Sequence, residues 1–119
     1  GVKHIAVYDV SSTHVSQAIA EAFRVSHIVL ASPTYNAGLY PAMEHVLLDM
    51  KALNLQNRTV ALIENGSWAS TSAKQMRAIL ETMKNITVME TSISVKSALK
   101  DDQITQIEDL ASQIASELL

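Results

Sequence analysis

Residues 27–50, HIVLASPTYNAGLYPAMEHVLLDM, join an aliphatic run, a turn-rich connection and an amphipathic run within one segment. After His27, the next four residues are β-branched or aliphatic, which is typical of a strand buried on both faces. After Pro41, which suits the first position of a helix, apolar residues recur at helical spacing. These residues are Met43, Val46, Leu47 and Met50. The segment therefore predicts a strand at 27–31, a connection at 32–41 and then a helix.

The same order of elements recurs along the rest of the chain. Further strands are expected at 4–8, 59–63 and 86–90, where β-branched and aliphatic residues cluster. Apolar residues at helical spacing follow these strands: Val15, Ile19 and Phe23, then Met76, Leu80 and Met83, then Ile104, Ile107, Ala111, Ile114 and Leu118. Alternating strands and helices give a parallel sheet with helices on both faces. We therefore expect an α/β fold with three layers, αβα, and a mainly parallel sheet of four or five strands.

Most of the expected helices also carry a polar start signal. Side chains that accept hydrogen bonds from a first helical turn are Ser12 or Thr13, Ser70 to Ser72, and Asp101 or Asp102. Residues 91–99, TSISVKSAL, make a longer connection than a strand and a helix normally share. Ile93 and Val95 either extend the preceding strand or restart it, and the sequence leaves both arrangements open.

The composition narrows the class of protein. The chain has 119 residues, nearly half of them apolar, which predicts a single domain over 1–119. No apolar run approaches the roughly 20 residues that span a bilayer, so a membrane partner is not expected. The formal net charge is −3 and no Lys/Arg cluster is present, which argues against a nucleic-acid partner. The chain has no Cys, which excludes disulfides and thiolate metal sites and is compatible with a cytoplasmic protein.

Aromatic residues gather where a ligand is expected, because open parallel sheets bind ligands at the carboxyl ends of their strands. Tyr35 and Tyr40 lie in one connection at that edge and Trp68 in another, although the chain has only five aromatic residues. Gly38 and Gly66 fall in the same two connections, where a missing Cβ allows positive φ or a close approach to a ligand. The rings either line a planar ligand or cover the core beneath them, and both interpretations remain open.

Polar residues at the same edge also admit more than one interpretation. Asn36 and Asn65 suit turns, and they equally suit hydrogen bonding to the edge of a heterocycle. Asp9 and Glu64 each end a strand and, with Lys96, suggest the acidic site of a phospho-receiver domain, although capping or turn roles are favoured. No pair of His residues has the one-turn helical spacing of a metal site, and no Ser lies in a nucleophile elbow. We therefore expect no catalytic and no metal-ligating residues.

Three stretches carry a resemblance to a known family. They are SPTYNAGLYPAMEHVL (32–47), NRTVALIENGSWAS (57–70) and YDVSSTHVSQAIAEAF (8–23). Together they resemble the flavodoxin-like domain at the carboxyl end of the flavo-diiron proteins, also called A-type flavoproteins. The resemblance runs from about Val7 to the last helix. Its most specific element is the string Ser-Pro-Thr-Tyr-Asn-x-Gly in combination with the later Asn-Gly-Ser-Trp.

The resemblance implies an electron-transfer domain that binds flavin mononucleotide (FMN), in an oxidoreductase whose diiron centre lies in a separate domain. Two loops would line the isoalloxazine ring. The implied cofactor-binding residues are Ser32, Pro33, Thr34, Tyr35, Asn36, Ala37, Gly38, Asn65, Gly66, Ser67 and Trp68. Electron-rich rings and a net acidic chain disfavour an anionic reduced flavin, which lowers its reduction potential. The expected partners are FMN and either a redox protein or the diiron domain of the parent chain.

The sequence departs from this family at its start. Flavodoxin-like domains begin with a central strand and a Ser/Thr/Gly-rich loop that holds the flavin phosphate, and neither precedes residues 4–8 here. Ser11, Ser12 and Thr13 have no Gly beside them, and helix capping explains their hydroxyl groups. We therefore expect a fragment of a longer protein that lacks this strand, binds FMN weakly or not at all, and can form a homodimer. The alternative is a cofactor-free module that associates with a protein partner through the same aromatic residues.

Overall fold

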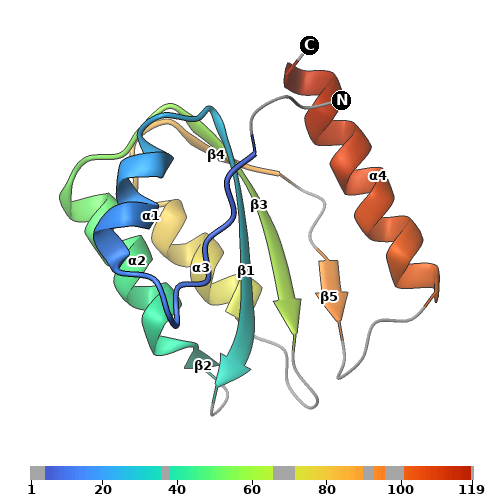
Figure 1. Cartoon of the computed structure of the whole chain (residues 1–119), viewed down its shortest axis with the longest axis horizontal. Coiled ribbons are helices and arrows are strands. Elements are labelled where there is room, and N and C mark those ends of the chain that lie inside the picture. Colours follow the sequence, from blue (N-terminus) through green and yellow to red (C-terminus); the bar gives the residue numbers. More distant parts are fainter. Residues whose placement is uncertain (1–4, 36–37, 66–71, 90–92, 96–100, 119) are drawn as a thin grey trace.

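The structure is a computed structural model of the chain, and it describes residues 5–35, 38–65, 72–89, 93–95 and 101–118. Helices and strands alternate within these residues (Figure 1). Their order is α1 (Val15–Ala22), β1 (His27–Tyr35), β2 (Gly38–Leu39), α2 (Pro41–Ala52), β3 (Arg58–Asn65), α3 (Ser72–Leu80), β4 (Ile86–Val88), β5 (Ile93–Val95) and α4 (Asp101–Leu118). The helices and the strands β1, β3 and β4 therefore form where the sequence predicts them.

The sheet is parallel except at one end. The order is β2-β1-β3-β4, with β1, β3 and β4 parallel and β2 antiparallel to β1. Strand β4 pairs with Arg58–Val60 at the start of β3, whereas β5 pairs with Ile63–Asn65 at its end. The structure thereby decides the arrangement that the sequence left open, because Ile93 and Val95 restart a strand on β3 after an interruption.

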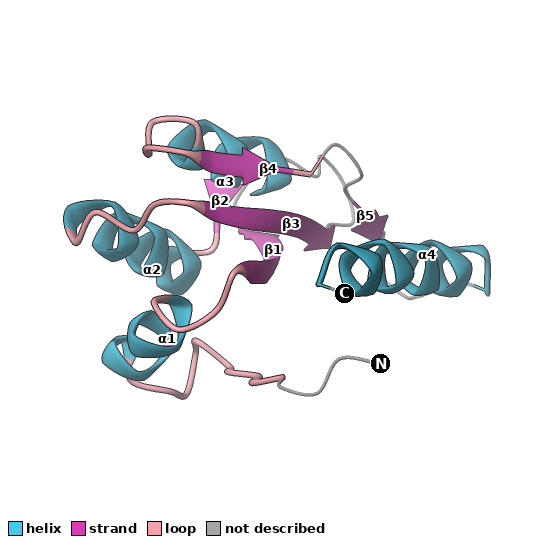
Figure 2. Cartoon of the chain, turned by 90° about the horizontal axis from the view of Figure 1, so that it is seen from above, coloured by secondary structure: helices cyan, strands magenta, loops and turns pink. Residues whose placement is uncertain are grey.

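Helices cover both faces of the sheet (Figure 2). Helices α1, α2 and α3 lie on one face, and their buried side chains form the larger core cluster with those of β1 and β3. Helix α4 lies on the other face, where Leu110 joins Ala61, Met89 and Ile93 in a smaller cluster. Burial of a large aliphatic side chain stabilises the fold by about 1.5–3 kcal/mol. The expected three-layer α/β architecture is confirmed.

Local interactions explain where two of the helices begin. Pro41 occupies the first position of α2, as predicted. Helix α1 is capped by His14, whose Nδ1 accepts a hydrogen bond from the Ser16 N–H at 3.1 Å. The prediction that Ser12 or Thr13 caps this helix is therefore wrong. Both residues belong to the preceding turn, where their backbone N–H groups donate to the carbonyl of Asp9, and the N-cap position falls to the next residue, His14.

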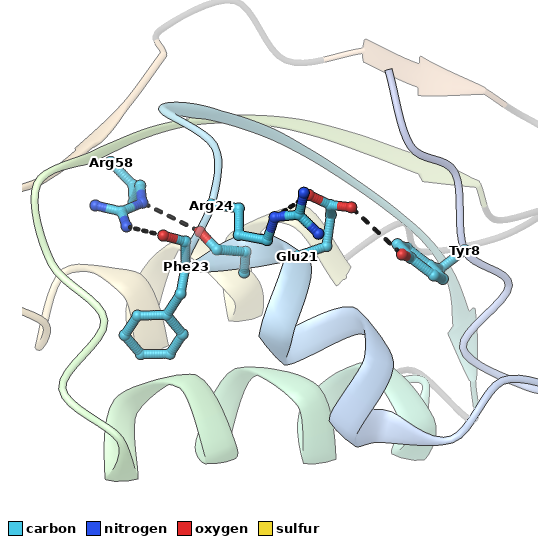
Figure 3. A network of polar contacts seen from close by, with 6 residues as sticks. Tyr8, Glu21, Phe23, Arg24 and Arg58 are labelled. Atoms are coloured by element: carbon cyan, nitrogen blue, oxygen red, sulfur yellow. Dashed lines mark hydrogen bonds and ion pairs between the residues drawn. The ribbon is translucent and has the colours of Figure 1, made fainter. Parts of the chain in front are cut away.

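Arg58 ties the end of α1 to the start of β3 (Figure 3). Its Nε donates to the carbonyl of Ala22 at 3.1 Å, and its Nη2 donates to the carbonyl of Phe23 at 3.1 Å. Nη1 donates to the carbonyl of Gln56 at 2.6 Å. The last carbonyls of a helix lack intrahelical partners, so one guanidinium satisfies them and fixes α1 against the sheet.

Residues 5–8 do not form the strand that the sequence predicts, and His4 lies outside the described residues. Ile5 and Val7 are 71% and 87% exposed, and Tyr8 donates only a long hydrogen bond, 3.5 Å, to Glu21 Oε1 (Figure 3). A strand forms only where a neighbouring strand accepts and donates its backbone hydrogen bonds, and no described strand pairs with residues 5–8. None of the helices in the described segments is long and apolar enough to cross a membrane.

Candidate functional site

The carboxyl ends of three parallel strands meet at one edge of the sheet (Figure 1). The register aligns Pro33 of β1 with Asn65 of β3, and Asn65 with Val95 of β5. The two stretches with aromatic residues and Gly follow Pro33 and Asn65 directly along the chain. The fold therefore brings the start of both predicted ligand loops together, as expected for a ligand site of an open parallel sheet.

The first predicted loop is shorter than expected. Residues Ser32–Tyr35 continue strand β1, and Gly38–Leu39 returns antiparallel as β2, with Tyr35 paired to Gly38. The prediction of an irregular connection over the whole of 32–41 is therefore wrong. Thr34 and Tyr35 lie beyond Pro33, the last residue of β1 that pairs with β3, and their antiparallel pairing with β2 gives their backbone groups partners instead.

The structure places some of the predicted cofactor-binding residues and not others. Ser32 is buried, at 4% exposure, and Asn65 is exposed at the last position of β3. Pro33, Thr34, Tyr35 and Gly38 have described backbones within β1 and β2, whereas their side chains lie outside the described part. The remaining predicted residues lie outside the described residues, and they are Asn36, Ala37, Gly66, Ser67 and Trp68.

A polar cluster ties the two strand ends to helix α3. The buried Ser72 hydroxyl donates to the Ser32 carbonyl at 3.2 Å and lies 3.5 Å from Glu64 Oε2. The same carboxylate oxygen accepts a hydrogen bond from the Ala73 N–H at 2.8 Å. Glu64 thus caps the first turn of α3, which agrees with the capping role that the sequence favoured. The cluster fixes the points from which both predicted loops leave the sheet.

Sequence reasoning missed the contact between Ser72 and Ser32. A start signal at Ser70 to Ser72 was visible, but the residues that form the contact lie 40 positions apart. Nothing local in the sequence indicates that a helix-start hydroxyl bonds to the main chain of another strand.

Tyr40 supports the core interpretation of one aromatic ring. It precedes α2 at the N-cap position without a side-chain cap, and its partly buried ring packs against the larger core cluster. A ligand interpretation of the aromatic residues therefore depends on Tyr35 and Trp68.

The segment DVSSTH forms a compact turn before α1. Asp9 Oδ1 accepts hydrogen bonds from the Ser11 hydroxyl at 2.6 Å and from the Ser11 N–H at 3.0 Å. These bonds favour the ionised carboxylate and hold the pKa of Asp9 below its usual value. Asp9 therefore has the turn role that the sequence favoured. Lys96 lies outside the described residues, and within the described ones no three His, Cys, Asp or Glu side chains gather to hold a metal ion.

The order and pairing of the strands, with helices on both faces, define a flavodoxin-like α/β domain. A solved structure similar to this chain is rubredoxin oxygen:oxidoreductase from the anaerobe Desulfovibrio gigas, at a TM-score of 0.84 and 26% identity. The match covers 92% of this chain and 27% of that one, so this chain spans about a quarter of that oxidoreductase. The predicted resemblance to the flavo-diiron type is confirmed.

Two flavodoxins share the fold at lower identity. A flavodoxin from the domain Archaea matches at a TM-score of 0.77 and 17% identity, over 91% of this chain and 73% of that one. Flavodoxin 1 from Bacillus cereus matches at a TM-score of 0.71 and 13% identity, over 86% of this chain and 74% of that one. No protein-family model matches the sequence, and a search of curated proteins found no relative.

The described residues suit the isoalloxazine ring of FMN better than its phosphate group. Asn65 presents an exposed amide at the edge where β1, β3 and β5 end, and an amide can donate to or accept from a heterocycle. The phosphate end is different, because anions bind where helix N-termini offer free N–H groups. Glu64 caps α3 and His14 caps α1, so side chains of this protein already occupy these two N-termini.

Proposed function

We propose that the chain is an FMN-binding electron-transfer domain of the flavo-diiron type. The observation that carries the proposal is the register of β1 and β3, which aligns Pro33 with Asn65 and so joins the two motif-bearing stretches at one edge. The similarity at 26% identity to an oxygen oxidoreductase supports a redox role over a purely structural one. FMN, when bound, supplies the capacity to accept and release electrons.

The residues of the chain would bind and orient the isoalloxazine ring. The stretch Ser32–Gly38 would contact it from the β1–β2 hairpin, and Asn65–Trp68 would contact it from the end of β3. The Asn65 amide would hydrogen bond to the polar edge of the ring. The Glu64 carboxylate next to Asn65, with the net charge of −3, disfavours negative charge on the reduced ring and so lowers the potential.

The affinity of the chain for FMN is proposed to be low. Glu64 and His14 occupy the N-termini of α3 and α1, and a phosphate at either place would compete with a bond that the fold already makes. Recognition would then rest on the ring alone, which leaves the charged part of the ligand in solvent.

The remaining parts of the proposal concern the setting of the domain. We propose that residues 1–119 act as one cytoplasmic domain that exchanges electrons with a redox protein or with a diiron domain. We also propose that the chain forms a homodimer. These assignments follow from the composition and from the resemblance to flavo-diiron proteins.

Titration of the chain with FMN tests the proposed function. Trp68 is the only Trp, so its fluorescence reports on the predicted loop directly. We expect saturable quenching together with a shift in flavin absorbance. Asn65→Ala should remove a hydrogen bond worth about 0.5–1.5 kcal/mol, which raises Kd roughly 2- to 12-fold.

A matched control separates this effect from general damage. Gln106→Ala removes an exposed amide from α4, away from the site, and should leave Kd unchanged. The absence of saturable quenching at millimolar FMN would contradict the proposal and favour the cofactor-free association module.

A further inference from the structure

Ser72 lies where helix α3 meets the ends of two strands. Its side chain is fully buried, and its hydroxyl donates to the Ser32 carbonyl of β1 at 3.2 Å. The same hydroxyl lies 3.5 Å from Glu64 Oε2 of β3. The register of the sheet pairs Ser32 with Glu64, so one hydroxyl contacts both members of this pair. At this pair, β1 and β3 lead into the two predicted ligand stretches.

The hydroxyl of Ser72 belongs to the face of α3 that packs on the sheet. Met76 and Leu80 follow at intervals of four residues, which places all three residues on one side of the helix, and both are buried in the larger core cluster. A buried hydroxyl lowers stability unless it forms hydrogen bonds, and Ala would fill nearly the same space. The contribution that distinguishes Ser72 from Ala is therefore its polar contact with the strand ends.

The contact with α3 restrains the part of the β1–β3 pairing that opens most easily. Local openings cost least free energy where a segment ends and has few buried contacts. Helix α3 supplies a restraint from outside the sheet, because Met76 and Leu80 anchor it in the core. The Ala73 N–H, which donates to Glu64 Oε2 at 2.8 Å, is a second contact between this helix and β3. The core packing of α3 is thereby transmitted to the strand ends.

We propose that Ser72 is a positioning residue of the flavin site. By holding Ser32 and Glu64 against α3, it fixes the spacing of the two stretches that would contact the isoalloxazine ring. Stretches that are already placed for one ligand lose less conformational freedom on binding, so their fixed spacing raises affinity. The inference deepens the proposed function and rests on it, and it assigns to Ser72 no contact with FMN itself.

Ser72→Ala tests the proposal in an FMN titration followed by Trp68 fluorescence. Loss of one hydrogen bond changes an equilibrium constant roughly 2- to 12-fold, so we expect Kd for FMN to rise about threefold or more. Leu55→Val is the control, because Leu55 is also buried in the larger core cluster but lies before β3, at the opposite end of that strand. This variant changes core packing away from the strand ends and should leave Kd unchanged.

A double-mutant cycle with Asn65→Ala separates positioning from a general loss of stability. If Ser72 acts by placing the stretch that begins at Asn65, part of the effect of Asn65→Ala is already lost in Ser72→Ala. The Kd of the double variant should then rise by less than the product of the two single effects. A residue that only stabilised the fold would give the full product. The full product, an unchanged Kd in Ser72→Ala, or an equal rise in Leu55→Val would each overturn the proposal.

Amide hydrogen exchange of the flavin-free chain is a second measurement, and it needs no ligand. Ser72→Ala should speed exchange in Ile63–Asn65 about twofold or more and leave Val60–Leu62 unchanged, because only the strand end loses a restraint. Unchanged exchange in Ile63–Asn65 would overturn the proposal whether or not FMN binds. If the unsubstituted chain bound no FMN while exchange responded as expected, the proposed flavin function would fail and the role of Ser72 at the strand ends would stand.

Discussion

Substitution of Glu64 separates the two contributions of its carboxylate to helix α3. The acceptor role is seen in the 2.8 Å hydrogen bond from the Ala73 N–H, and the charge lies at the positive end of the helix dipole. Glu64→Ala removes both contributions. Glu64→Gln keeps an oxygen acceptor and removes only the charge.

The expected losses of stability follow from these two terms. Loss of an N-cap acceptor costs about 0.5–2 kcal/mol, and loss of a charge at the helix N-terminus costs about 0.3–1 kcal/mol. We expect Glu64→Ala to lower the free energy of unfolding by about 1 kcal/mol and Glu64→Gln by roughly half of that. In a domain of this size, about 1 kcal/mol lowers Tm by roughly 4 °C.

Urea unfolding followed by circular dichroism measures both variants. Glu81, exposed just beyond the other end of α3, provides the control pair Glu81→Ala and Glu81→Gln. A carboxylate near a helix C-terminus does not stabilise the helix, so these variants should not be less stable than the unsubstituted chain. No loss of stability in Glu64→Gln would refute the charge contribution, whereas equal losses for the two Glu64 variants would refute the contribution of the hydrogen-bond acceptor. A loss in Glu81→Ala as large as in Glu64→Ala would refute the capping argument altogether.

Two further predictions concern the segments that flank α1. Arg58→Met removes the hydrogen bonds to the Ala22 and Phe23 carbonyls, so we expect the free energy of unfolding to fall by about 1–3 kcal/mol and the amides of α1 to exchange faster. The control is Arg24→Met, at a side chain that is 70% exposed, which should change neither the free energy of unfolding nor the amide exchange. The pKa of Asp9 is lower in the folded chain than its usual 3.8, so its stabilising effect is present above that value and is lost as pH falls through the folded-state pKa. Asp9→Asn should therefore flatten the loss of stability below about pH 4 in urea unfolding, and an unchanged acid limb would contradict this role.

The elements that the sequence predicted well carry local signals. Pro41 followed by apolar residues at helical spacing identifies α2, and the uninterrupted run at 59–63 identifies β3. Both elements contribute to the hydrophobic core, since Leu47 of α2 and Leu62 of β3 are fully buried in the larger core cluster. Their burial agrees with their local pattern, so no distant information was needed.

The predictions that failed depended on distant partners. Residues 5–8 have the composition of a strand, but β-propensity measures fit to a neighbouring strand and none of the described strands pairs with them. The continuation of β1 to Tyr35 required knowledge that Gly38–Leu39 folds back on it. The link between Ser72 and Ser32 likewise depends on how α3 packs on the sheet. Local sequence patterns predict where helices and strands form, whereas the polar contacts of the site depend on how these helices and strands pack together.

Two short strands, β4 and β5, share one side of β3, and this arrangement affects how easily the backbone hydrogen bonds of β3 open. Among the described strands, β3 is bonded on one side by β1 and on the other by two separate short strands. Short edge segments can open one at a time while the β1–β3 ladder stays closed, and amide protection reflects such local openings. We therefore expect the amides of β3 that bond to β1 to exchange last with solvent. Strand β3, which carries Glu64 and Asn65, would then be the last of the described strands to open, so these two residues would keep their positions during local openings elsewhere in the described sheet.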